Sequence, residues 1–128
     1  MKNKGNGDQT PSNVFNIIGN GTNIKGDINA SGDIRVDGSV LGNLVSVGKL
    51  IIGEQGYIEG ESKVKIADIS GSYKGKLTAA ELVILRSTSK FEGDLFTKKI
   101  VIEEGSVFNG TLTMEQKSEV KSNVKKDQ

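Results

Sequence analysis

One short pattern recurs along the middle of this chain: an apolar residue, a variable residue, glycine, a second variable residue and usually an aliphatic one. Its six copies are IKGDI (24–28), VLGNL (40–44), IEGES (58–62), YKGKL (73–77), FEGDL (91–95) and FNGTL (108–112). The central glycines lie 16, 18, 15, 18 and 17 residues apart. A period this short indicates a solenoid, in which each repeat forms one coil that stacks on its neighbour.

The residues within each repeat indicate strands. Apolar and polar residues alternate, which is strand spacing, and each unit adds an aliphatic pair two residues apart. These pairs are Ile34/Val36, Leu50/Ile52, Ala67/Ile69, Leu82/Ile84 and Ile100/Ile102. Three short strands per repeat predict an all-β fold, a single-stranded parallel β-helix of about six coils. At about 4.8 Å per coil, the rod is on the order of 29 Å long.

Stacked coils align equivalent residues into ladders. The two predicted inward ladders are Ile24, Val40, Ile58, Tyr73, Phe91, Phe108 and Ile28, Leu44, Ser62, Leu77, Leu95, Leu112. The glycine between the ladders would weaken a regular strand, so we expect it to mark a bend or bulge. The predicted outward stacks are Glu59, Lys74, Glu92 and Glu61, Lys76, Asp94. Opposite charges on adjacent strands are favourable, which is typical of a solvated face.

The chain divides into three parts. Residues 1–15 contain little to bury and are predicted to form a disordered arm. Residues 16–114 form the β-helical core, and residues 115–128 form a polar tail that is also predicted to be disordered. The segment before residue 14 has no apolar stretch typical of a secretory signal, and no apolar run approaches the roughly 20 residues of a membrane span. We therefore expect a cytoplasmic protein.

Composition excludes several classes of function. The 17 Lys and Arg residues nearly balance 16 Asp and Glu residues, which argues against a nucleic-acid partner. Histidine and cysteine are absent, so imidazole and thiol chemistry and the usual metal centres are excluded. We predict no catalytic, cofactor or metal site. The carboxylate pairs Asp33/Asp37 and Glu103/Glu104 and the long bend RSTSK (86–90) are interpreted as solvent-exposed.

The core resembles the bactofilins, bacterial cytoskeletal proteins that form polymers. The resemblance rests on GTNIKGDINASGDIRVDGSVLGNL (21–44), LIIGEQGYIEG (50–60) and IVIEEGSVFNGTL (100–112). Variable repeat lengths favour a right-handed helix over the left-handed hexapeptide type but leave the hand open. The resemblance implies a right-handed β-helix of triangular section that polymerises end to end without nucleotide. It also implies a scaffold role in cell shape or envelope assembly at the inner membrane face.

A β-helix is open at both ends, so its first and last coils expose strand edges and the rim of the apolar core. The candidate interface residues are Ile17, Ile18, Ile24 and Ile28 at the N-terminal end, and Val107, Phe108, Leu112 and Met114 at the C-terminal end. Phe108 is the foremost candidate, because an exposed aromatic ring buries a large area on contact. The resemblance also implies a filament-critical phenylalanine near this end. Alternatively, Phe108 closes the core beneath a folded-back tail.

Three functions follow from these patterns. The first is a homopolymeric scaffold, whose partners would include cell-wall synthesis or remodelling proteins. The second is a non-polymerising β-helical module that binds a cell-wall protein or glycan. The third is a β-helical enzyme, for which no clustered acids are evident. Lys2 and Lys4 alone would contribute only about 1 kcal/mol each near an anionic membrane, so we expect recruitment through a partner rather than direct membrane binding.

Overall fold

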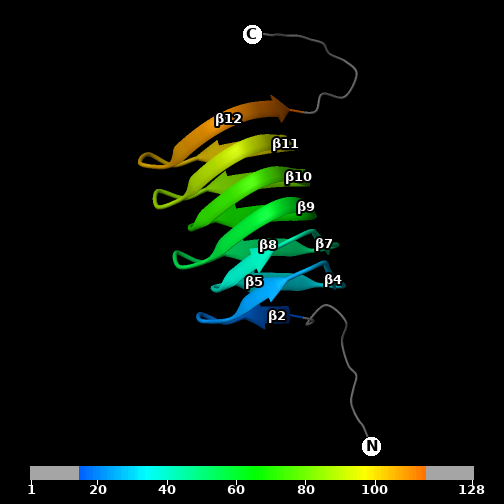
Figure 1. Ribbon diagram of the computed structural model, residues 1–128. Helices are drawn as coiled ribbons and strands as arrows, with labels where there is room; N and C mark the ends of the chain where they lie inside the picture. The colour runs from blue at the N-terminus through cyan, green and yellow to red at the C-terminus, as the bar shows by residue number, and fades with distance from the viewer. Residues whose placement is uncertain (1–14, 115–128) are drawn as a thin grey trace, which may run out of the picture.

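The chain folds into a short rod of stacked coils (Figure 1). This computed structural model describes residues 15–114. The predicted arm and tail lie outside the described residues, apart from Phe15, which is the first residue of the first described strand. Every described element is a strand, and all pairs of neighbouring strands are parallel.

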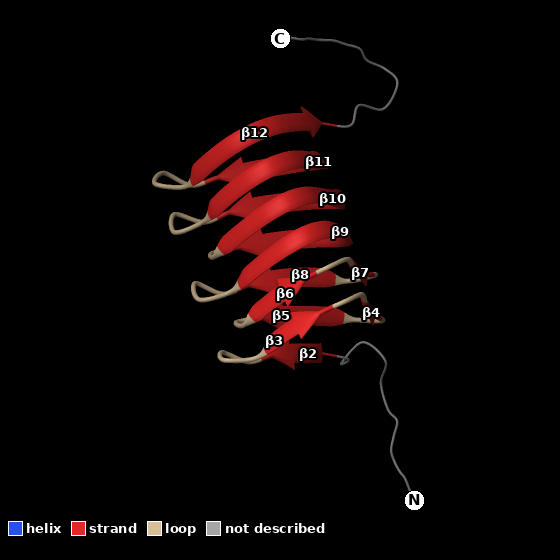
Figure 2. Cartoon of the chain, in the orientation of Figure 1, coloured by secondary structure: helices blue, strands red, loops and turns tan. Residues whose placement is uncertain are grey.

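The strands lengthen toward the C-terminus. The short ones are β2 (Phe15–Ile18), β3 (Asn23–Lys25), β4 (Ile28–Ala30), β5 (Asp33–Val36), β6 (Ser39–Leu41), β7 (Leu44–Ser46) and β8 (Lys49–Ile52). The long ones are β9 (Tyr57–Ile69), β10 (Ser72–Leu85), β11 (Lys90–Ile102) and β12 (Val107–Met114). Each long strand continues around a corner that separates two short strands in the earlier coils (Figure 2).

Each of six coils contributes one segment to each of three faces. Face A consists of β2, β5, β8 and residues 66–69, 82–85 and 99–102. Face B consists of β3, β6 and residues 57–59, 72–74, 90–92 and 107–109. Face C consists of β4, β7 and residues 62–64, 77–79, 95–97 and 112–114. Three faces give the rod a triangular section.

The coils turn in a right-handed sense. In Figure 1 the strands nearest the viewer run from left to right while the chain climbs from its N-terminal to its C-terminal coil. The predicted class, a right-handed parallel β-helix of about six coils, is confirmed.

Both predicted inward ladders are confirmed by the strand register. On face B the ladder ends in three aromatic residues. The ring centroids of Tyr73 and Phe91 are 5.1 Å apart, those of Phe91 and Phe108 are 5.2 Å apart, and both pairs are nearly parallel. Buried Tyr73 keeps its hydroxyl satisfied by donating to the Lys76 carbonyl at 2.6 Å.

The assignment of Leu82/Ile84 to the same repeat position as the pair Ala67/Ile69 is wrong, because Val83 and Leu85 pair with those two residues. Val83 and Leu85 are the fully buried residues, whereas Leu82 and Ile84 are outward and only partly covered. The cause is a register shift between Ala79 and Leu82, where β10 has one more residue than either neighbour. In β10 the buried positions therefore stay in one phase from Leu77 to Leu85, whereas in β9 the phase changes between Val64 and Ala67.

The repeated glycines lie at the corner between faces B and C, so the expected bend at these glycines agrees with the structure. From Gly26 to Gly110 their φ angles lie between 130° and 148°, a region that residues with a side chain rarely adopt. From the second coil onward, a Cβ at each would also overlap the carbonyl oxygen of the corresponding glycine one coil earlier. The repeat therefore carries glycine for two reasons, backbone conformation and close contact between coils.

The other two corners account for the uneven repeat length. Between faces A and B the chain uses either four residues, as at 53–56 and 86–89, or two, as at 37–38 and 70–71. Between faces C and A it uses two residues or one. The segments on the faces keep their lengths, so the variation in glycine spacing is confined to corners.

Candidate functional site

Within residues 15–114, the C-terminal end of the core is an open surface, and this surface is the candidate site. On β12, Phe108 and Leu112 continue the two inward ladders, and Met114 pairs with buried Thr97. Leu112 and Met114 are 38% and 41% exposed, although the residues one coil earlier on these ladders are buried. Phe108 stacks on Phe91 with one side of its ring and is only partly buried. The last coil thus presents apolar side chains along the rod axis.

Val107 differs from its three predicted companions. It pairs with exposed Lys90, points outward on face B and is 44% exposed. The structure therefore places Val107 beside the end surface and not on it.

The N-terminal end also presents core residues. Ile24 and Ile28 are partly buried and pack against the core, and Ile18 is nearly buried beneath Val36. Ile17 faces outward on face A next to Arg35 and is 62% exposed. Three of the four predicted residues thus meet at this end, and Ile17 lies on the side of the rod.

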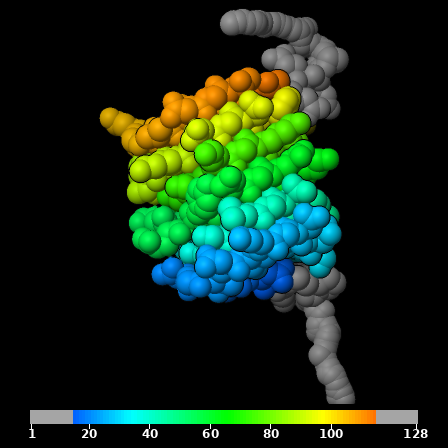
Figure 3. All heavy atoms as spheres, viewed as in Figure 1, coloured from blue at the N-terminus to red at the C-terminus, as the bar shows by residue number. Residues whose placement is uncertain are grey.

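Both ends carry open strand edges. β12 and β2 are the outermost strands of the sheet path, and each pairs on one side only within residues 15–114. Figure 3 shows the coils as successive bands from blue to orange, so each end of the described rod is made by one coil. An exposed edge of this kind can pair with a strand of another chain.

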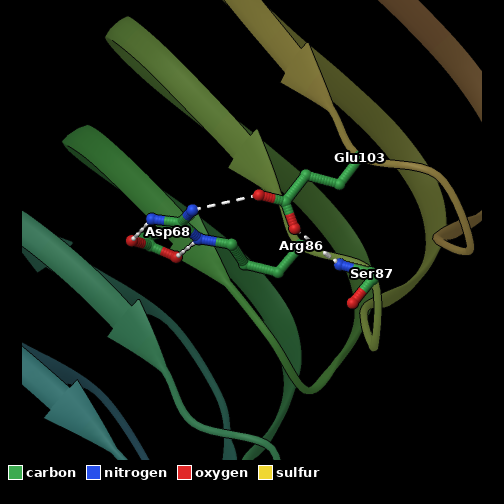
Figure 4. Close-up of polar contacts among 4 residues, drawn as sticks. All are labelled: Asp68, Arg86, Ser87 and Glu103. Atoms are coloured by element: carbon green, nitrogen blue, oxygen red, sulfur yellow. Dashed lines mark hydrogen bonds and ion pairs between the residues drawn. The ribbon is translucent and has the colours of Figure 1, made fainter.

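A charged cluster that the sequence did not reveal holds three coils together on one edge of the rod. Arg86 donates from Nε and Nη2 to the two carboxylate oxygens of Asp68 at 2.9 and 2.8 Å, and from Nη1 to Glu103 at 3.1 Å (Figure 4). Glu103 also accepts the backbone N–H of Ser87 at 3.0 Å. The hydrogen bond to Asp68 is the chief reason that the pKa of Arg86 is raised.

The charges interpreted as solvent-exposed also make specific bonds: Arg86 and Glu103 are 41% and 40% exposed, as expected, yet they bond to each other across coils. Asp33 accepts the backbone N–H of Lys49 at 2.9 Å, and Asp37 accepts Nε of Arg35 at 2.8 Å. Asp68, Arg86 and Glu103 lie 18 and 17 residues apart, about one coil each, so the repeat period was the signal that could have identified the cluster. These contacts stabilise the stack and enclose no reacting group.

The described residues contain no group of three or more His, Cys, Asp or Glu side chains arranged to hold a metal ion. Within the same part of the chain there is no helix with the length and hydropathy needed to cross a bilayer.

Comparison with known proteins identifies the fold family. Residues 16–113 match the family model for bactofilins, which is described as polymer-forming cytoskeletal. The chain is 27% identical over 101 residues to bactofilin BacO of Myxococcus xanthus, covering 79% of this chain and 80% of BacO. It is 32% identical over 104 residues to BacP of the same organism, covering 80% of this chain but only 43% of BacP.

A solved structure agrees in shape as well as sequence. The Thermus thermophilus bactofilin in a cryo-EM reconstruction of double helical filaments superposes with a TM-score of 0.74 at 35% identity, covering 78% of this chain and 99% of that one. The resemblance seen in the sequence is therefore confirmed. This chain belongs to the bactofilin family of polymer-forming cytoskeletal proteins, which are structural proteins and not enzymes.

Proposed function

We propose that this protein assembles end to end into filaments without nucleotide, and that the filaments are a scaffold for factors that determine cell shape or build the envelope. The observation that carries the proposal is the open C-terminal end of the core. There the aromatic ladder stops at Phe108, and Leu112 and Met114 are more than a third exposed.

The ends of the rod offer apolar area for association. Burying a fully exposed large apolar side chain contributes about 1.5–3 kcal/mol. Leu112 and Met114 are 38% and 41% exposed, and Phe108, Ile24 and Ile28 are partly buried, so each would contribute roughly 0.5–1 kcal/mol. Association itself costs about 4–15 kcal/mol in lost freedom of motion. Hydrophobic burial thus offsets part of this cost, and strand pairing along the open edges of the first and last described coils adds directional hydrogen bonds.

Assembly of this kind needs no bound nucleotide, because its driving force is contact between surfaces that are already formed. The glycines of GNG (19–21) belong to a tight turn, in which the Thr22 N–H donates to the Gly19 carbonyl at 3.1 Å. We therefore interpret this segment as a corner of the first coil, and not as a phosphate-binding loop.

The cellular role follows from the repeating surface of a filament. A polymer presents the same three faces at every subunit, so a client that binds one subunit weakly binds a filament through many equivalent sites. Clients of this type would include proteins that synthesise or remodel the cell wall. Through such a partner the filament would reach the inner face of the membrane.

The test compares two phenylalanine variants. Phe108→Arg places a charge at the proposed contact, where it would lose water without gaining a partner. Phe96→Arg makes the same change at an outward ring on face C that is 39% exposed and lies 5.5 Å from the Lys76 ammonium. Both proteins would be studied without nucleotide by negative-stain electron microscopy and sedimentation, with circular dichroism to verify the fold.

We expect filaments from the wild type and from Phe96→Arg, and folded, non-assembling protein from Phe108→Arg. A wild type that remains monomeric at high concentration would disprove the scaffold proposal. Filaments of normal length from Phe108→Arg would instead show that the contact lies elsewhere.

A further inference from the structure

The last coil carries an Asn-Gly pair at its corner glycine. Asn109 and Gly110 lie on β12, where faces B and C meet, and both residues are exposed. An asparagine in this position is chemically labile, because the backbone nitrogen of the next residue can attack its side-chain amide. Glycine as the next residue has no Cβ to keep the two groups apart. In the earlier coils the residue before the corner glycine is Lys25, Leu41, Glu59, Lys74 or Glu92.

Hydrogen bonds between coils cover the glycine nitrogen elsewhere in the rod. The Gly26 N–H donates to the Leu41 carbonyl of the next coil at 2.9 Å. The Gly42 N–H likewise donates to the Glu59 carbonyl at 2.9 Å. The corner glycines stack in one register position, so the Gly110 N–H also points toward a following coil. Since β12 is the outermost strand within residues 15–114, no acceptor for that N–H lies in this part of the chain.

We propose that Asn109 is a site of spontaneous deamidation, and that end-to-end assembly protects it. This inference rests on the filament proposed above, in which a second subunit covers the last coil. In an unassembled subunit the Gly110 nitrogen is free to react. At a filament contact a strand of the neighbouring subunit supplies the missing acceptor. The site therefore distinguishes unassembled subunits from assembled ones.

The reaction needs only water as a co-reactant. The Gly110 nitrogen attacks the side-chain carbonyl carbon of Asn109, and because both groups belong to one residue pair the attack is intramolecular. A new C–N bond closes a five-membered imide, the bond to the side-chain amide nitrogen breaks, and ammonia leaves with the proton of the Gly110 N–H. Water then opens the imide at either carbonyl carbon. The product at position 109 is aspartate or isoaspartate, and the latter carries one extra carbon in the main chain.

Both products damage the end surface of the rod. A carboxylate at position 109 lies beside Glu92, its partner on the adjacent strand, and like charges on neighbouring strands repel. Isoaspartate also lengthens the main chain before Leu112 and Met114, which shifts their register on face C. These two residues belong to the proposed contact, so a deamidated subunit should join filaments poorly.

The matched control is Leu41→Asn, which places the same Asn-Gly pair at an internal coil. Leu41 is 37% exposed, and the side chain of Asn109 is also exposed. The φ angles are similar, 148° at Gly42 and 142° at Gly110. The two pairs differ in the glycine N–H, which is bonded to the next coil only at Gly42. One Leu41→Asn chain thus carries both pairs and compares them under identical conditions.

This chain would be incubated at mildly alkaline pH as filaments, as unassembled protein, and denatured in guanidinium chloride. Unassembled protein is obtained by dilution or by adding Phe108→Arg, with sedimentation to verify its state and circular dichroism to verify the fold. Peptide mapping by mass spectrometry follows the replacement of NH₂ by OH at each position. It also separates both pairs from Asn20–Gly21, which lies at a side corner of the first coil.

In unassembled protein we expect Asn109 to react at close to the rate of the denatured chain, and position 41 to react at least about tenfold more slowly, because its N–H is released only when coils separate. In filaments we expect Asn109 to be slowed by a similar factor. Equal rates at positions 41 and 109 in unassembled protein would overturn the assignment of the site. Equal rates at Asn109 in filaments and in unassembled protein would overturn the protection.

The consequence for assembly is tested by ageing. Wild-type protein that is aged unassembled and then concentrated should form fewer filaments than fresh protein. Asn109→Gln should prevent that loss, because its longer side chain forms the ring slowly, and an equal loss in this variant would contradict the proposed damage. Absence of any filament from fresh wild-type protein would overturn the proposed function and with it the protection. The comparison of positions 41 and 109 would still decide the deamidation itself.

Discussion

The glycine corner offers a quantitative test of how tightly the coils pack. Gly26 and Gly93 occupy equivalent corners with the same φ of 131°. They differ in their surroundings: a Cβ at Gly26 would meet nothing within 4 Å, whereas a Cβ at Gly93 would overlap the Gly75 carbonyl oxygen. Replacement by alanine at both positions therefore separates backbone strain from crowding between coils.

Strain at the corner costs on the order of 1–3 kcal/mol and is common to both variants. At Gly93 the overlap forces the two coils apart, which adds about 1–3 kcal/mol of overpacking. It also adds about 0.5–1.5 kcal/mol for each sheet hydrogen bond that is weakened. We expect Gly93→Ala to lower the free energy of unfolding by about 2–4 kcal/mol more than Gly26→Ala does.

The assay is urea unfolding followed by circular dichroism, at a concentration where sedimentation shows no assembly. Gly26 lies in the first coil, so fraying at that end could also make its replacement inexpensive. Gly110→Ala controls for this, because Gly110 lies in the last coil yet its Cβ would overlap the Gly93 carbonyl oxygen. Equal losses in Gly26→Ala and Gly93→Ala, within about 0.5 kcal/mol, would refute the crowding argument, since only backbone strain would then remain.

Two further predictions concern polar side chains of the coils. Arg86→Lys keeps the charge but loses the two-pronged bond to Asp68, so the free energy of unfolding should fall, and it should fall by less in high salt. A loss that salt does not change would contradict this explanation. Burial raises the pKa of Tyr73 from 10.0 to about 12, and a hydrogen bond to Glu59 raises that of Tyr57 to about 12. Because the unfolded chain then loses these protons first, stability should be intact below pH 10 and should fall between pH 10 and 12. Tyr73→Phe should make that fall shallower in pH-dependent urea titrations, and an unchanged slope would rule Tyr73 out as a source.

Much of the fold could be predicted because the apolar residues that recur once per repeat are the ones that face inward. Ile24, Val40 and Ile58 share one register position, so stacking parallel coils brings them together, and the structure agrees. Alternation within one face also predicts which residues point inward, but the length of the corner between faces C and A determines whether the same phase continues on the next face. It continues in β10, where Leu77 and Val83 are both buried, and it changes in β9; no marker in the sequence distinguishes the two corners.

The candidate site was harder to predict than the fold. Which coil is terminal follows from the repeat, so Phe108 and Leu112 could be placed at an end. Whether a side chain on that coil points along the axis or sideways depends on the alternation within its strand, and Val107 and Ile17 point sideways. The Arg86 cluster could not be predicted from local sequence, because its three residues meet only after two turns of the helix.

The corners of unequal length make this rod a ready-made display surface for engineering. Two- and four-residue connections join the same two faces without altering the strands, so an inserted peptide at the exposed Glu54–Gln55 corner should leave the coils aligned. Doubling the length of a flexible connection costs only about 0.6 kcal/mol. An epitope at that corner would decorate an assembled filament once per subunit, at intervals on the order of 29 Å, and so provide a molecular ruler along its length.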